Sequence, residues 1–175
     1  MIVPNEKEIK SILKNKNMIL KSLRTKRCEI YRELMDKEDF MRAILLHTPQ
    51  MAQANNKGAG YKDVVDEMQN YEKQSRKYVS ELRTLLKEIT KKEAVVRKVW
   101  YCFSRLPEPY YTYLHALYVD QLPYKDVLKR SGCSNSIFAR RRKKAMEMLQ
   151  NLYSQTPNDD PWYLTDLKDT PEITY

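Results

Sequence analysis

The chain has 175 residues, enough for one ordinary domain or two small ones, and its 42% hydrophobic content supports a folded core. Its formal charge of +9 favours a polyanionic partner, of which nucleic acid is the commonest. Three scattered cysteines argue against a disulfide framework or a zinc site, and the lack of any long apolar run argues against a signal peptide or membrane span, so we expect a cytoplasmic protein without a cofactor.

The first expected helix covers residues 5–46. Asn5 can cap it, and Glu8, three residues later, completes a capping box. Apolar residues then recur at heptad spacing, with interruptions such as Lys16 and Lys37. Few β-branched runs alternate with polar residues here or elsewhere, so the fold class is predicted to be all-α. This first segment is predicted to be one long helix that can be kinked.

A loop is predicted at residues 47–60, where Pro49, an Asn pair and two glycines interrupt the pattern. Residues 61–106 then show the strongest periodicity in the chain, with twelve of fourteen heptad a and d positions apolar. The a positions are Tyr61, Met68, Ser75, Leu82, Ile89, Val96 and Phe103. The d positions are Val64, Tyr71, Tyr78, Leu85, Lys92, Val99 and Leu106. This repeat predicts a supercoiled rod of about 60 Å.

Two long helices joined by a loop predict an antiparallel, coiled-coil-like hairpin over residues 1–106. The same stripe could instead pair between subunits, because a heptad repeat does not specify whose helix it faces. We expect a homodimer through the helices of residues 5–106, since helix-turn-helix proteins that bind DNA commonly dimerise.

The segment Leu106-Pro107-Glu108-Pro109 is expected to end the rod, because proline removes an amide donor and restricts the residue before it. Residues 107–155 are predicted to form a compact unit with helices at 108–122, 123–131 and 135–153. Pro123 suits the first helical turn, Gly132 can take the left-handed conformation that ends a helix, and Ser134 can cap the next one. These are the parts of a helix-turn-helix.

On a helical wheel, residues 135–153 separate into two faces. The packed face, within about 40° of Phe138 at 100° per residue, also holds Ala145, Leu149 and Leu152. The outward face holds Ser136, Arg140, Lys143, Lys144 and Glu147. Arg141 lies near the boundary between the faces. Arg142 lies on the inward side, so its charge must reach solvent along its stem.

A basic outward face on the second helix is typical of a recognition helix in the DNA major groove. The residues expected to read base edges are Asn135, Ser136, Ala139, Arg140 and Lys143. Phosphate contacts are expected at Arg141, Lys144 and Lys129, and at the capped helix N-terminus at Ser134. The alternative is that this is the solvated basic face of an ordinary bundle helix.

The segment LPEPYYTYLHALYVDQLPYKDVLKRSGCSNSIFARRRKKAMEML resembles region four of bacterial sigma factors. The residues that carry the resemblance are Leu106-Pro107, Tyr124, Asp126-Val127, Gly132-Cys133-Ser134 and Ala145. The residues that depart from the pattern are Leu128, Ser131 and Arg142. The resemblance implies a DNA-binding helix-turn-helix.

The layout of the whole chain also resembles phage-encoded late-gene transcriptional regulators of the RinA and ArpU kind, which place a helical region, a loop and a long helix before a sigma-like helix-turn-helix. This resemblance implies control of phage or prophage transcription in a bacterial host. The regulator would bind a promoter, and contact with RNA polymerase is an additional option.

Residues 156–175 hold one lysine against five Asp/Glu and are predicted to be an irregular acidic tail. His47 and His115 are isolated in sequence, so no catalytic or metal site is expected and the chain is not predicted to be an enzyme. Two other functions remain open. One is a DNA-packaging oligomer resembling a small terminase subunit, which would form a ring, and the other is a protein-interaction module acting on the transcription machinery.

Overall fold

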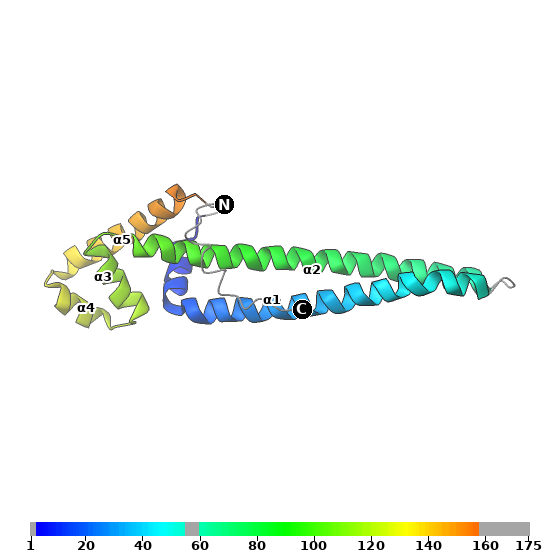
Figure 1. Ribbon diagram of the computed structural model, residues 1–175. Coiled ribbons are helices and arrows are strands. Elements are labelled where there is room, and N and C mark those ends of the chain that lie inside the picture. Colours follow the sequence, from blue (N-terminus) through cyan, green and yellow to red (C-terminus); the bar gives the residue numbers. More distant parts are fainter. Residues whose placement is uncertain (1–2, 55–59, 158–175) are drawn as a thin grey trace. The chain divides into compact units, whose positions relative to one another are not determined.

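The computed structural model describes residues 3–54 and 60–157, and every regular element within these ranges is helical, which confirms the all-α prediction. Figure 1 shows the elements in order. They are α1 (Glu6–Ala54), α2 (Gly60–Ser104), α3 (Tyr110–Leu114), the π-helix η1 (His115–Val119), α4 (Tyr124–Ser131) and α5 (Asn135–Gln155). No helix within the described ranges combines the length and the apolar character that crossing a membrane would require.

The prediction of a loop at residues 47–60 is wrong at both boundaries. The helix α1 continues through Pro49 to Ala54, and α2 begins at Gly60. The residues that follow Pro49 are mainly Gln, Met and Ala, which favour helix and extend it despite the lost amide donor. Residues 55–59 lie outside the described part of the chain, as do residues 158–175 of the expected tail.

Close packing divides the chain into two units. The first, here called the head unit, comprises residues 1–21 and 92–175, and the second, the hairpin unit, comprises residues 22–91. The division therefore falls within the two long helices rather than at the expected boundary after residue 106. The first turns of α1 and the last turns of α2 pack with the helix-turn-helix.

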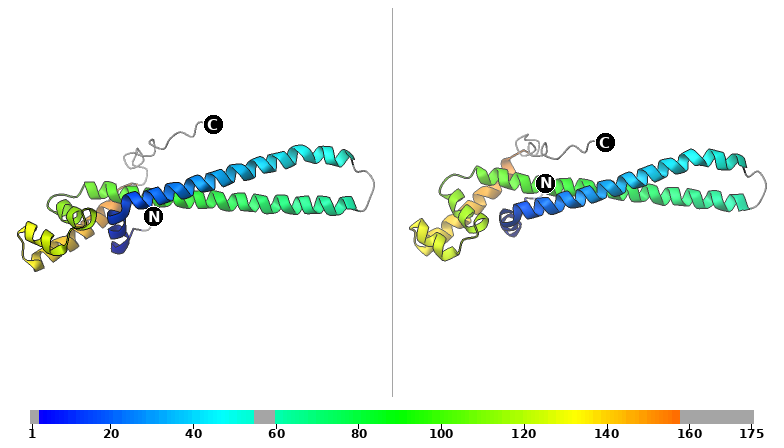
Figure 2. Two further views of the ribbon diagram at one scale, coloured as in Figure 1. Left: turned by 90° about the horizontal axis from the view of Figure 1, so that it is seen from below. Right: turned by 60° about the horizontal axis from the view of Figure 1, so that its bottom comes forward.

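In the hairpin unit, α1 and α2 lie side by side and run in opposite directions (Figures 1 and 2). Phe40 contacts Tyr71, and Glu33 contacts Tyr78, so the residue numbers fall on one helix as they rise on the other. The buried cluster between the helices contains Leu34, Val79, Leu82 and Leu86, with Ile30 packed against it. These contacts confirm the antiparallel hairpin within one chain.

The heptad register predicted for α2 is only half right in this unit. Three a positions are buried as expected, namely Ser75, Leu82 and Ile89. Three d positions are exposed, namely Tyr71, Tyr78 and Leu85. The second buried row instead lies four residues after Ser75 and Leu82, at Val79 and Leu86. The helix carries three adjacent apolar rows, and a single partner helix covers only two of them.

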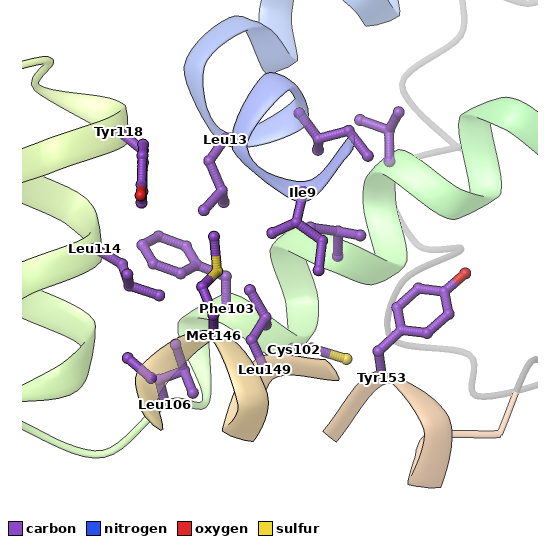
Figure 3. Close-up of a cluster of buried hydrophobic side chains, with 14 of the residues drawn as sticks. Ile9, Leu13, Cys102, Phe103, Leu106, Leu114, Tyr118, Met146, Leu149 and Tyr153 are labelled. Carbon is purple, nitrogen blue, oxygen red and sulfur yellow. The ribbon is translucent and has the colours of Figure 1, made fainter. Parts of the chain in front are cut away.

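The head unit is built around a cluster of buried side chains from several helices (Figure 3). Its labelled members are Ile9, Leu13, Cys102, Phe103, Leu106, Leu114, Tyr118, Met146, Leu149 and Tyr153. The capping box predicted at the start of α1 is confirmed: Asn5 N–H donates to Glu8 Oε2 at 2.8 Å, and Glu8 N–H donates to Asn5 Oδ1 at 2.9 Å. The helix then departs from helical geometry at Asn15, where φ is −128° and ψ is 23°.

The helix-turn-helix has its own small core, in which Tyr113, Val127 and Phe138 are buried. The expected helix 108–122 is shorter and is divided into α3 and η1. Pro123 does not lie in the first helical turn as predicted, because it precedes α4 as the N-cap residue, with a ψ of 138°. The three helices nevertheless occur in the order and approximate places that the sequence predicts.

Candidate nucleic-acid interface

The turn between α4 and α5 has the local geometry that the sequence predicts. Gly132 ends α4 in the left-handed conformation, with φ of 62° and ψ of 11°. Ser134 is the N-cap of α5, and its Oγ accepts a long hydrogen bond from the backbone N–H of Ile137 at 3.5 Å. The thiol of Cys133 packs into the small core and lies 3.3 Å from the carbonyl oxygen of Ser131. Gly132 at the end of α4 and Ser134 at the start of α5 therefore define the turn between the two helices.

The burial of α5 matches the helical wheel. Phe138, Ala145 and Leu149 are buried as expected, together with Met146 and Tyr153, and Leu152 is half-buried. The residues predicted to face outward or to begin the helix are exposed, namely Ser134, Asn135, Ser136, Ala139, Arg140, Lys143 and Lys144. Lys129, near the end of α4, is exposed as well. One continuous exposed surface of α5 thus carries three cations, while contact with DNA stays a prediction.

Two neighbours define the exposed surface at the start of α5. Tyr124 Oη donates to Asn135 Oδ1 at 2.8 Å, which orients the side-chain amide and leaves its NH2 group as the donor toward a ligand. Ile137 is 45% exposed on the outward side. Ile137 is not among the site residues predicted from the sequence, although its place on the helical wheel, about 100° from Phe138, is a usable signal.

Arg141 is held by the protein itself. Its Nη1 donates to Tyr113 Oη and to Cys133 Sγ, each at 3.1 Å, and the side chain is half-buried. The hydrogen bond to Tyr113, more than the nearby Cys133, raises the pKa of the guanidinium further above its usual value. Arg141 therefore ties α5 to α3 and to the turn. A guanidinium has five N–H groups. The predicted phosphate contact of Arg141 therefore depends on the N–H groups that do not bond to Tyr113 or Cys133.

The other cations of the basic run differ in their neighbours. The guanidinium of Arg142 lies 5.8 Å from the ring centroid of Tyr124, and Lys144 Nζ lies 5.9 Å from that of Tyr110. Lys143 Nζ is 3.9 Å from Glu147 Oε1, a long, exposed ion pair that is worth little in water. Such weak contacts leave the lysines free to exchange their partners for phosphate.

Glu6 lies close enough to this surface to sense its charge. Its pKa is lowered, mainly by the hydrogen bond from Lys10 and also by the charges of Arg142 and Lys143. A hydrogen bond holds the start of α1 near α5: Gln150 Nε2 donates to the carbonyl oxygen of Pro4 at 3.3 Å. Glu6 therefore places a negative charge near Arg142 and Lys143, at the border of the basic surface.

A pocket of 460 Å³ lies between α3, η1 and α4, and its lining includes Tyr111, His115, Asp120, Arg130 and Ser131. His115 Nδ1 is 3.1 Å from Asp120 Oδ2. His115 looks isolated in the sequence, because the pair depends on a π-helix, which brings together residues five apart. Within the described residues, no three His, Cys, Asp or Glu side chains gather as metal ligands would.

Comparison with protein-family models, curated proteins and solved structures finds no match for this chain.

Proposed function

We propose that this chain is a sequence-specific, double-stranded DNA-binding transcriptional regulator whose recognition helix is α5. The observation that carries the proposal is the exposed surface of α5, which presents Arg140, Lys143 and Lys144 directly after a glycine turn and an N-capped helix start. The opposite face of the same helix is buried in the head unit. This is the arrangement by which a helix-turn-helix inserts its second helix into the major groove.

Base and phosphate contacts follow from position along α5. Asn135, Ser136 and Ala139 lie in its first two turns, Arg140 directly follows Ala139, and Lys143 lies about one turn further along. Arginine can pair with two acceptors of guanine, and the amide of Asn135 can donate to a base acceptor. Ser134, Lys129, Arg141 and Lys144 border this surface and suit phosphates, which position the protein without reading sequence.

The resemblance of residues 106–149 to sigma region four favours promoter DNA as the target. A phage or prophage origin and a role in the bacterial cytoplasm fit that resemblance, and RNA polymerase is then a second partner. We further propose that the regulator acts as a homodimer, as helix-turn-helix proteins commonly do.

The proposal is tested by selecting bound fragments from a pool of random double-stranded DNA with the full chain. A common sequence motif is expected. The double variant Arg140→Ala, Lys143→Ala should then lose affinity for the selected sequence by about thirtyfold or more, because each lost base contact costs roughly 1–3 kcal/mol.

The matched control is Lys91→Ala, Lys92→Ala, which removes the same charge from two exposed positions on α2. This variant should retain the preference for the selected sequence. Equal losses in both double variants would show that the interaction is only a response to net charge. Failure to select any motif would overturn sequence-specific binding.

A further inference from the structure

The hairpin unit exposes a row of large apolar side chains that its own core does not use. Tyr71, Tyr78 and Leu85 on α2 are 41%, 37% and 46% exposed, and Phe40 on α1 is 48% exposed. We call these four residues the flank stripe. The three residues of α2 are spaced by seven, so they form one line of about 21 Å along the helix.

Contacts across the hairpin show that the stripe lies on a single side of the two-helix seam. Phe40 packs edge-on against Tyr71, with ring centroids 5.7 Å apart. Tyr78 Oη donates to the Glu33 carboxylate, and Lys37 Nζ lies 6.0 Å from the Tyr78 ring centroid. Glu33, Lys37 and Phe40 are four and three residues apart, so they share one face of α1. The stripe therefore has contributions from both helices.

Within its described residues, the hairpin unit buries few apolar side chains. Its buried cluster holds only Leu34, Val79, Leu82 and Leu86 in the described residues. A pair of helices buries one seam, and stable helical domains add further helices that cover the remaining apolar rows. The flank stripe is such a row, and its seven-residue spacing is the spacing by which helices pack lengthwise on one another.

We propose that the flank stripe is the surface by which two copies of this chain associate. Its four side chains each leave on the order of 80–100 Å² exposed, so pairing two copies would bury about 700 Å² from these residues alone. Flanking side chains would bring the total toward the roughly 1,200 Å² at which specific interfaces begin. A twofold interface uses the same patch on both copies, which requires a patch that does not repel itself.

The charges beside the stripe meet that requirement. Glu33, Lys37 and Glu81 lie near Tyr78 of the stripe. Lys77, which precedes Tyr78, and Glu88, three residues after Leu85, are exposed as well. Although the chain as a whole carries +9, this side of the hairpin unit has both signs. Mixed charge of this kind permits association with an identical surface and does not favour a nucleic acid. The proposal concerns a different surface from α5 and does not depend on DNA binding.

The test is the mass of the full chain in solution, measured by sedimentation equilibrium at tens of micromolar. The 20.9 kDa chain is expected to sediment at twice its mass. The double variant Tyr78→Lys, Leu85→Lys should sediment as a monomer, because it places four cations within the paired surface. Both positions are more than a third exposed, and lysine at position 78 can pair with Glu33, so we expect the hairpin to stay folded. A neutral second variant, Tyr71→Gln, Leu85→Gln, should raise the dissociation constant at least tenfold.

The matched control is Tyr31→Lys, Met35→Lys. Tyr31 and Met35 are 43% and 40% exposed on α1, but the helical period places them about 160° from Glu33, on the other side of the seam. This control should remain a dimer. A monomeric wild type, a ring-sized mass, or equal dissociation by the control would each overturn the proposal, whether or not the chain binds DNA.

Discussion

At the residue scale, the turn of the helix-turn-helix depends on Gly132. Its φ of 62° lies in the left-handed region, and a Cβ built there would have no atom within 4 Å. Gly132→Ala should therefore cost only the backbone strain, because the added methyl group meets no other atom. The reduced entropy of the unfolded chain offsets part of that strain. We expect a net loss of about 1 kcal/mol in the free energy of unfolding. Urea unfolding followed by circular dichroism measures this loss.

Gly132→Asn is the comparison variant, and it should cost about half as much, since Asn tolerates the left-handed region better than Ala. If Ala proved less costly than Asn, the left-handed turn would be contradicted.

Only part of the candidate site could be predicted from the sequence. The exposure of Arg140, Lys143 and Lys144 follows from a period of 100° per residue and could be predicted. The hydrogen bonds of Arg141 could not, because its partner Tyr113 is 28 residues away and is positioned by tertiary packing. Side-chain partners of that kind are invisible to periodicity.

At the element scale, α2 shows why a strong heptad repeat can still predict the wrong row of side chains to be buried. Leu82 and Leu85 occupy the predicted a and d positions, yet Leu82 is 4% exposed and Leu85 is 46% exposed. The positions three and four residues after Ser75 and Leu82 are all apolar, namely Tyr78, Val79, Leu85 and Leu86. The sequence therefore predicts the helix and its antiparallel partner but does not determine which of two neighbouring rows the partner covers.

These two leucines provide a matched test of the register. Leu82→Ala should lower the free energy of unfolding by about 2–4 kcal/mol, because it removes buried atoms and leaves a cavity. Leu85→Ala deletes the same atoms from a half-exposed position and should cost less than about 1 kcal/mol. Both are measured by denaturant unfolding at concentrations where the chain is monomeric. Equal costs, or a larger cost at Leu85, would favour the a and d register instead.

At the scale of the whole molecule, the all-α class and the order of the helices could be predicted, but the division into units could not. The first turns of α1 belong to the head unit, where Gln150 hydrogen-bonds to Pro4, a separation of 146 residues. Neither residue carries a local signal of this contact. The proline-rich segment at 106–109 follows the end of α2, yet the boundary between the two packed units lies within that helix, between residues 91 and 92.

The division predicts unequal protection along a single helix. Residues 96–103 of α2 contribute Val96, Val99, Cys102 and Phe103 to the large head cluster, whereas residues 75–89 contribute to the small hairpin cluster. The free energy of local opening rises with buried apolar contact, so amides of 75–89 should exchange with deuterium well before those of 96–103. Exchange followed by mass spectrometry of the full chain measures this difference.

Dilution adds a second prediction for the same experiment. If two copies pair through the flank stripe, lowering the protein concentration should speed exchange in residues 75–89 and leave residues 96–103 unchanged, since association protects only the surface it covers. The Tyr78→Lys, Leu85→Lys variant serves as the control. Its exchange rate in residues 75–89 should not change with protein concentration. Uniform protection along α2 at all dilutions would instead mean that the helix opens as one cooperative unit, against the division into head and hairpin.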